Sequence, residues 1–327
     1  MYKGQILPAN SNLQRHWHRP RALPARFRRT RLLIIGCGDV GQRVARMLHE
    51  QSGRTGQHGP RVLALTSSPG KRASLEALGV RPLLGNLDDP HSLRHLRGVA
   101  QRILHLAPPP GQGAHDTRTI ALLRVLAQGV LQPRALVYGS TTGVYGDCGG
   151  AWIDETRCVA PSTPRARRRV DAEQGIRAFG LRTGTRTTLL RIPGIYAPDR
   201  DGGTPRGRLL KNLPVLQAAD DVFTNHIHAD DLARACLAAL WRGRPQRAVH
   251  VCDNTVLRMG DYLDMAADLY GLPRPARISR TQAQHMLPAM MLSFMGESRR
   301  LRNDRLRMEL RVRLHWPTVQ EGLATFV

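Results

Sequence analysis

The chain has 327 residues and a formal net charge of +24. This length allows a sizeable core, either as one large α/β domain or as a domain with a smaller lobe. No apolar run approaches the length of a membrane span, and the first thirty residues lack the apolar stretch of a secretory signal. We therefore expect a cytoplasmic protein that has no membrane partner.

The cysteines are odd in number, scattered, and never spaced as Cys-x-x-Cys. This pattern argues against both a disulfide framework and a zinc knuckle. They are Cys37, Cys148, Cys158, Cys236 and Cys252.

The basic residues are almost all arginine. Lys3, Lys71 and Lys211 are the only lysines, so 46 of the 49 basic residues are arginines, spread along the chain. A surface of this charge attracts polyanions in a salt-dependent way. Aromatic residues make up only 5%, however, and no zinc-finger spacing or aromatic-basic alternation is present. The arginine usage fits coding bias as well as selection, and we do not expect specific nucleic-acid binding.

Residues 1–30 are basic, contain several prolines and show no apolar periodicity. This composition predicts a disordered basic arm. The sequence leaves open whether the arm is an anion-binding tail or the product of a start site placed too early.

The most informative segment is Arg31 to Gly41, an apolar run that ends in Gly-x-Gly-x-x-Gly and leads into a helical pattern. In a dinucleotide-binding turn the first glycine allows the tight turn and the second lets the backbone approach a pyrophosphate. The third lets the helix pack closely on the strand, and the helix N-terminus faces the phosphate charge. The predicted cofactor-binding residues here are Gly36, Gly38, Asp39, Val40 and Gly41.

From Arg31 onward, short apolar runs alternate with helical stretches, which favours a parallel sheet built from βαβ units. The predicted strands are 32–35, 62–66, 83–84, 103–106, 135–138 and 188–192. The predicted helices are 40–50, 71–78, 91–96, 116–128 and 165–179. The expected fold class is therefore α/β, with a Rossmann-type doubly wound parallel sheet.

At the end of the second predicted strand the chain reads Thr66-Ser67-Ser68-Pro69-Gly70-Lys71-Arg72, with no carboxylate to bind a ribose diol. This favours NADP over NAD, since Ser67, Lys71 and Arg72 are placed to meet a 2′-phosphate. A solvated first helical turn is the alternative interpretation of the same residues. Asp88 and Asp89 lie after the third strand, where we expect them to cap the next helix.

Three further segments resemble the extended short-chain dehydrogenases/reductases, in that family's order. Val137-Tyr138-Gly139-Ser140-Thr141-Thr142-Gly143-Val144-Tyr145-Gly146 is similar to the family's fifth strand and following loop. Leu190-Arg191-Ile192-Pro193-Gly194-Ile195-Tyr196 looks like the sixth strand. Asn225-His226-Ile227-His228-Ala229-Asp230-Asp231-Leu232-Ala233 resembles the Arg-Ile-His-Val-Asp-Asp-Leu-Ala signature. The resemblance runs from residue 31 to the C-terminus and implies a small-molecule substrate, with a homodimer as an open expectation.

The departure from this family is at the catalytic position. The stretch that matches Pro-x-x-x-Tyr-x-x-x-Lys has Arg165 in place of the tyrosine and Arg169 in place of the lysine. Arginine does not release its proton in a useful pH range, so Arg165 cannot be the general base. Arg169 can still donate hydrogen bonds to a ribose, because that task needs only a fixed cation.

The resemblance also suggests other site residues. Thr141 matches the family's hydroxyl that hydrogen-bonds the substrate oxygen, and Ala107 and Pro108 match a loop on the nicotinamide side. Tyr145 is the phenol nearest to Thr141 in sequence, and an arginine that lowered its pKa would suit it to proton transfer. The alternative is that Tyr145 is a structural part of Val-Tyr-Gly. The kept glycine motif and the missing tyrosine resemble the atypical short-chain dehydrogenases, which keep the nucleotide fold and lose or relocate the tyrosine.

The expected organisation is a nucleotide-binding domain over 31–196 and a smaller substrate lobe over 197–222 and 252–327, with 223–251 returning to the first domain. The substrate is expected between the two parts. His226 and His228, with Asp230 and Asp231 nearby, invite a metal interpretation, but alternation on a short strand and a helix cap account for them, and we expect no metal.

Three functions remain open at this stage. The first is an NAD(P)-dependent oxidoreductase or epimerase that acts on a hydroxyl or carbonyl, with a sugar-like substrate as one option. The second is a non-catalytic dinucleotide-binding sensor or scaffold. The third is a polyanion-binding module that uses the basic arm and Arg165 to Arg169, and it predicts nucleic-acid affinity that falls steeply with salt and is lost when residues 1–30 are removed.

Overall fold

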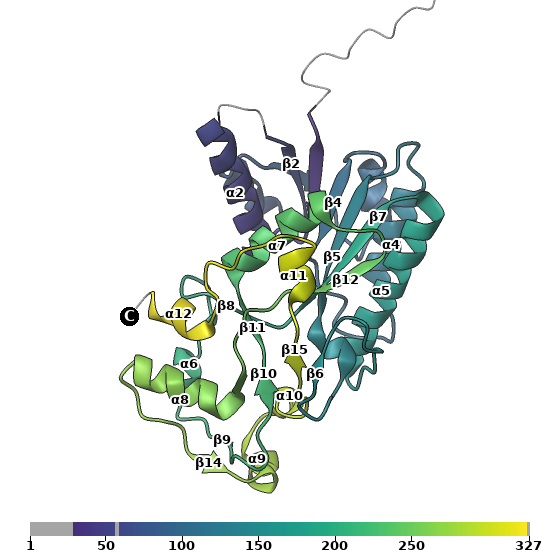
Figure 1. The fold of residues 1–327 in the computed structure, drawn as a ribbon. Coiled ribbons are helices and arrows are strands. Elements are labelled where there is room, and N and C mark those ends of the chain that lie inside the picture. Colours follow the sequence, from purple (N-terminus) through teal and green to yellow (C-terminus); the bar gives the residue numbers. More distant parts are fainter. Residues whose placement is uncertain (1–28, 56–58, 326–327) are drawn as a thin grey trace, which may run out of the picture.

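The computed structural model describes residues 29–55 and 59–325, arranged around a parallel sheet (Figure 1). Within these residues the central sheet has seven parallel strands in the order β12-β7-β5-β4-β1-β2-β3. They are β1 (Arg31–Ile35), β2 (Arg61–Thr66), β3 (Arg81–Leu84), β4 (Arg102–His105), β5 (Ala135–Thr141), β7 (Arg186–Ile192) and β12 (Arg247–His250). The strand order runs outward from β1 in both directions, which confirms the predicted doubly wound, Rossmann-type fold.

Helices cover both faces of this sheet. The longer ones are α2 (Asp39–Thr55), α4 (Thr117–Ala127), α5 (Pro164–Thr183) and α7 (Ala229–Arg242). In β1, Leu32 and Ile34 pack in the same core cluster as residues of α2 and α7, whereas Leu33 and Ile35 pack with residues of α4 and α5. A strand that is buried on both faces is apolar throughout, which explains the continuous run at 32–35.

Some element bounds differ from the prediction. Helix α2 continues to Thr55, five residues beyond the predicted end, and the Ser52 hydroxyl donates to the Leu48 carbonyl within it (2.9 Å). The short helices after β2 and β3 are partly or wholly of the 3-10 type: η1 (Pro69–Lys71), followed by α3 (Arg72–Ala77), and η2 (Pro90–Leu96). The Asp89 side chain accepts from the His91 amide (3.0 Å) and caps η2, as predicted, whereas Asp88 pairs with Arg118.

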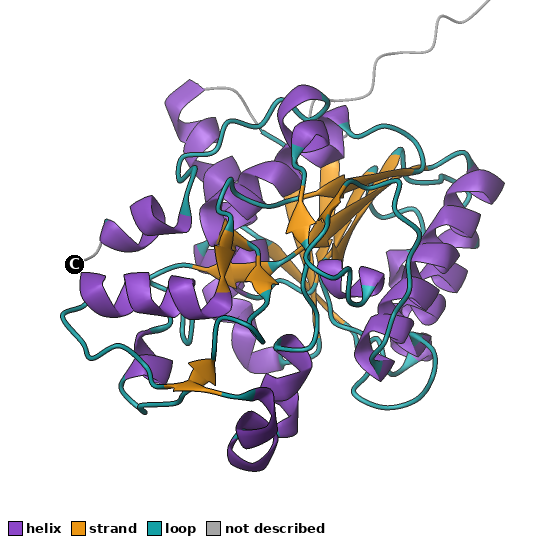
Figure 2. Cartoon of the chain, turned by 60° about the horizontal axis from the view of Figure 1, so that its bottom comes forward, coloured by secondary structure: helices purple, strands orange, loops and turns teal. Residues whose placement is uncertain are grey.

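The C-terminal part builds a smaller lobe from short helices and two-stranded pairs, in the lower part of Figure 1; Figure 2 shows the molecule with this part turned forward. The pairs are β8 (Gly194–Tyr196) with β11 (His226–His228), β9 (Val215–Leu216) with β14 (Arg277–Ile278), β10 (Phe223–Thr224) with β13 (Leu257–Arg258), and β6 (Trp152–Ile153) with β15 (Arg300–Leu301). The helices are α6 (Arg206–Leu209), α8 (Met259–Leu269), α9 (Arg280–Met286), α10 (Ala289–Phe294), α11 (Asp304–Met308) and α12 (Val319–Ala324).

Segment 223–251 is shared between the two parts. Its β12 is an edge strand of the central sheet and α7 packs on that sheet, whereas β10 pairs with β13 in the lobe. The predicted basic arm lies, apart from residues 29 and 30, outside the described residues. In the described part of the chain, no helix is both long and apolar enough to cross a membrane.

Candidate active site at the carboxyl edge of the sheet

The glycine turn between β1 and α2 has the geometry that a phosphate-binding turn requires. Gly36 has φ +83°, and a Cβ there would lie 2.4 Å from the Ala107 nitrogen, so only glycine fits. A Cβ on Gly38 would meet nothing within 4 Å, whereas one on Gly41 would lie 3.2 Å from the Gly36 carbonyl oxygen. The turn therefore packs tightly on β4 and α2 and stays open at Gly38, which fits a pyrophosphate at the start of α2.

The first turn of α2 carries a carboxylate, Asp39, that would repel a pyrophosphate if it were unpaired. Arg43 pairs with it, because its Nε donates to Asp39 at 3.0 Å, and Arg200 lies 3.7 Å from the other carboxylate oxygen. The same guanidinium also donates to Asp199 (2.7 Å) and Asp230 (2.5 Å), and so ties α2 to the loop after β8 and to the start of α7. Val40 packs against the core cluster on this face of the sheet.

The ends of β2 and β4 flank this turn. Ser67, Lys71 and Arg72 are exposed beyond β2. Lys71 lies near the thiol of Cys37: burial raises the pKa of that thiol to about 11, and the Lys71 charge acts in the opposite direction. Beyond β4, the Ala107 amide donates to the Ile35 carbonyl (3.1 Å).

The loop after Ala107 is held to the helices behind it. The Pro108 carbonyl accepts from Arg118 (3.3 Å), which also makes a bidentate ion pair with Asp88 at 2.7 Å. Arg168 on α5 donates to the carbonyls of Gly111 and Gly113 (3.1 and 2.8 Å). The segment predicted to lie on the nicotinamide side is therefore anchored at several points.

A cleft of about 740 Å³ lies between the end of β5, the start of α5 and the C-terminal lobe. Its polar lining includes Thr141, Arg165, Arg169, Arg208, Glu297 and Arg299. His226 also lines it, together with apolar side chains such as Met291 and Phe294. The structure thus brings the predicted residues Thr141 and Arg169 together in one cleft.

The two arginines on α5 differ in how they are held. Arg169 donates from Nη1 to the Tyr138 hydroxyl (3.0 Å) and the Gly139 carbonyl (2.8 Å), which fixes it at the end of β5. Arg165, one helical turn earlier, lies with its guanidinium carbon 4.7 Å from the centre of the Phe294 ring. The Thr141 hydroxyl accepts weakly from the Gly143 amide (3.3 Å) and caps the 3-10 turn η3 (Thr142–Tyr145).

Of the two interpretations of Tyr145, catalytic or structural, the geometry favours the structural one. Tyr145 is 1% exposed, and it is not among the residues that line the cleft. The hydroxyl accepts from Arg191 (2.7 Å) and lies 2.6 Å from His250 Nε2. His250 Nδ1 faces the Arg302 carbonyl (2.9 Å), which assigns the ring proton to Nδ1 and makes Tyr145 the donor to Nε2. Burial raises the pKa of Tyr145 to about 12, in spite of Arg191, which disfavours release of the phenolic proton.

Behind the cleft, the same network continues through a buried ion pair. Arg191 binds both carboxylate oxygens of Glu173 (3.2 and 2.8 Å), and Ser140 donates to the same carboxylate at 2.6 Å. The Arg191 and Glu173 side chains are each 5% exposed. This network joins β5, α5, β7 and β12 and positions the strand that ends in Thr141.

The histidine pair has separate roles in the structure. His228 caps α7 by accepting from the Asp230 amide (3.2 Å), and Asp231 accepts from the amides of His315 and Trp316. His226 is buried, which lowers its pKa to about 4, and its Nδ1 has no hydrogen-bond partner among the described residues. In the described ranges no group of three or more potential ligands is placed to hold a metal ion.

Sequence reasoning missed Arg208, Glu297 and Arg299, which reach the cleft from the C-terminal lobe. No local motif marks these residues, and the segments that carry them are joined to the cleft only by folding. Met291 lines the cleft, and Met295 is buried in a small core cluster.

The comparisons with known proteins agree with this geometry. A solved structure of a functionally unknown conserved protein from Silicibacter pomeroyi is 31% identical, with a TM-score of 0.73, over 90% of this chain and 97% of that chain. UDP-glucose 4-epimerase from Thermotoga maritima, solved with UDP-glucose, is 16% identical with a TM-score of 0.72, over 90% and 96%.

The dTDP-glucose 4,6-dehydratase DesIV from Streptomyces venezuelae, solved with bound NAD, is 21% identical with a TM-score of 0.72, over 90% of this chain and 95% of that chain. A comparison with the curated proteins gives no match. The sequence pattern of the NAD-dependent epimerase/dehydratase family matches residues 32–252, which is more than half of the chain. Together with the glycine turn, the doubly wound sheet and the cleft at its carboxyl edge, this match shows that the chain belongs to the NAD-dependent epimerase/dehydratase family of extended short-chain dehydrogenases/reductases.

Proposed function

We propose that this protein binds NAD(P) at the β1–α2 turn and acts as an epimerase, dehydratase or reductase on a hydroxyl or carbonyl of a small, sugar-like substrate. The observation that carries this proposal is the shared edge of the glycine turn and the cleft. Gly36 follows β1 and Thr141 ends β5, and these strands are separated only by β4. Two strand spacings are about 10 Å, a distance that a bound dinucleotide spans.

We assign residues separately to the pyrophosphate, the nicotinamide end and the adenosine ribose of the cofactor. Gly36, Gly38, Asp39, Val40 and Gly41 would hold the pyrophosphate, and Ala107, Pro108 and Arg169 would hold the nicotinamide end. Ser67, Lys71 and Arg72, with no carboxylate at the end of β2, favour NADP over NAD. Bound NAD(P) supplies a carrier that accepts or returns a hydride.

The remaining chemistry belongs to the cleft. Thr141, which lines the cleft, would hydrogen-bond the reacting oxygen. Neither Arg165 nor Arg169 accepts a proton at ordinary pH. Among the described residues that line the cleft, Glu297 is the sole carboxylate, and it accepts hydrogen bonds from Ser162 (2.7 Å) and Arg299 (2.9 Å). We therefore assign the proton-accepting role to Glu297.

A non-catalytic sensor or scaffold is the second candidate, and arginine at both family catalytic positions favours it. The test is a calorimetric titration with NADP(H) and NAD(H), followed by turnover of hydroxyl and carbonyl compounds by the wild type and Glu297→Gln. Binding with turnover that is lost in Glu297→Gln supports the enzyme. Binding without turnover supports the sensor, and no binding of either cofactor overturns both. A homodimer and a cytoplasmic location stay predictions.

A further inference from the structure

The cleft has a strong excess of positive charge. Four of its lining side chains are arginines, and a single carboxylate, Glu297, faces them in the described part of the chain. Glu297 pairs with Arg299, which leaves Arg165, Arg169 and Arg208 without a carboxylate partner. Arg208 instead donates to the Pro214 carbonyl (3.0 Å), and burial lowers its pKa.

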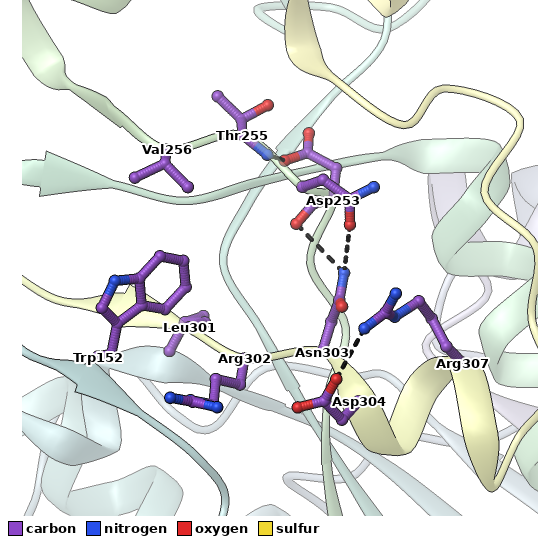
Figure 3. A pocket seen from close by; sticks show the side chains of 10 residues that line it. Trp152, Asp253, Thr255, Val256, Leu301, Arg302, Asn303, Asp304 and Arg307 are labelled. Carbon is purple, nitrogen blue, oxygen red and sulfur yellow. Dashed lines mark hydrogen bonds and ion pairs between the residues drawn. The ribbon is translucent and has the colours of Figure 1, made fainter.

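A second hollow allows a comparison of how its arginine and those of the cleft are paired. This hollow, of about 340 Å³, is lined by Trp152, Asp253, Asn303, Asp304 and Arg307, among others (Figure 3). There Arg307 pairs with Asp304 at 2.7 Å, and Asn303 donates to the backbone of Cys252 and to Asn254. Among the described residues, Arg307 of this hollow therefore has a carboxylate partner, whereas Arg165, Arg169 and Arg208 of the main cleft have none.

Arg165 and Arg169 are one helical turn apart on α5, and both line the cleft. Residues at this spacing lie on the same helix face, so their guanidinium groups can approach one ligand. The Arg169 contact with the Gly139 carbonyl places that ligand near Thr141, which is the end of the cleft where we propose the reaction. The apolar ring of Phe294 under Arg165 leaves the guanidinium N–H groups free to donate.

We propose that Arg165 and Arg169 form a binding site for an oxyanion of the substrate, a carboxylate or a phosphate, next to the reacting carbon. A guanidinium group matches either oxyanion with paired hydrogen bonds, which a tyrosine at the same position does not provide. The inference deepens the proposed function and rests on it, because it names an anionic group at the reacting end of the substrate.

The test is a calorimetric titration of the full chain at low ionic strength with glucuronate, glucose 6-phosphate and glucose as probes. We expect one of the two anions to bind and glucose not to bind, and the identity of the anion distinguishes a carboxylate from a phosphate. Arg165→Gln is expected to weaken anion binding at least about tenfold, because charge-assisted hydrogen bonds are lost. Arg165→Lys is expected to retain part of the affinity.

Arg167→Gln is the matched control. Arg167 is exposed on the same first turns of α5 but does not line the cleft. If Arg165→Gln and Arg167→Gln weaken binding equally, the attraction is diffuse electrostatics and the site is wrong. If neither anion binds, the site is also wrong.

A parallel titration of the same variants with NADP separates this inference from the proposed function. NADP binding without anion binding removes the oxyanion site and keeps the proposed cofactor site. Anion binding without NADP binding keeps the oxyanion site and removes the proposed cofactor site.

Discussion

The starts of α2 and α5 lie at the same edge of one sheet, yet they follow the family pattern very differently. The α2 start keeps every glycine of the dinucleotide turn, whereas the α5 start has arginines where the family has its tyrosine and lysine. A pyrophosphate site is built mainly from backbone amides and from the absence of side chains. An acid–base site is built from side chains, so a few substitutions change its chemistry without changing the fold. The predictions below test this contrast.

The largest effect is expected at the inner face of α5, where Glu173 supports the cleft. Glu173→Gln leaves the buried Arg191 guanidinium without its counter-charge, and breaking a buried pair costs about 3–5 kcal/mol. Urea unfolding measures this loss. Asp268→Asn is the control, because the Asp268 pair with Arg274 is on the surface, and it is expected to leave the unfolding midpoint unchanged. Equal midpoints for Glu173→Gln and wild type would contradict the structural role of the network.

Gly38→Trp tests the backbone-built site. An indole in the open space in front of α2 blocks the pyrophosphate, and NAD(P) affinity is expected to fall by at least about 100-fold, which is about 2.7 kcal/mol. Gly53→Trp is the matched control, since Gly53 lies near the other end of α2 and a Cβ there also meets nothing within 4 Å. The nucleotide site is elsewhere if calorimetry gives both variants the same affinity.

The protonation of His250, which belongs to the buried network, makes the free energy of unfolding depend on pH. Burial lowers its pKa to about 4 in the folded state, from an ordinary 6.5. Above pH 6.5 the ring is neutral in both states. As the pH falls from 6.5 to 4, the unfolded state takes up a proton that the folded state does not, so the folded protein loses stability, by about 2–3 kcal/mol from this group.

The comparison of wild type with His250→Gln isolates this effect. The other buried titratable groups, such as Asp253, are present in both proteins and cancel in the difference. The gap between their free energies of unfolding is expected to shrink as the pH falls from 6.5 toward 4. A gap that stays constant with pH in urea titrations would show that His250 does not titrate in this window.

Arg169 gives the smallest expected change. Arg169→Met removes the cation proposed for the nicotinamide ribose and is expected to weaken NAD(P) binding about tenfold, which is about 1.4 kcal/mol. Arg169→Lys restores the family residue and is expected to bind within about threefold of wild type. Arg167→Met serves as the control on the same helix. If all three variants bind NADP equally well, Arg169 does not contact the cofactor.

The overall fold and the geometry of the glycine turn could be predicted from local patterns. The apolar run before Gly36, the glycine spacing and the alternation of strands and helices are properties of neighbouring residues, and the sheet order confirms what they indicate. The predicted end of α2 was five residues too early. The helix continues through a polar segment that contains glycine, and within it the Ser52 hydroxyl donates to the Leu48 carbonyl.

The cleft could not be predicted in the same way. Tyr145 follows Thr141 closely in sequence, but the turn η3 carries it into the buried network with Arg191 and His250. Glu297 and Arg299 lie more than 120 residues beyond Arg169 and reach the cleft through the pairing of β15 with β6 and the packing around it.

The sequence by itself determined the fold class, the glycine turn and the loss of tyrosine and lysine at the family's catalytic positions, because each depends on residue identity within a short segment. The tertiary structure decided which titratable groups face the cleft, which arginines keep unpaired charge there, and which phenol is buried. Those properties depend on contacts between distant segments, where burial and ion pairing set the chemistry of each side chain.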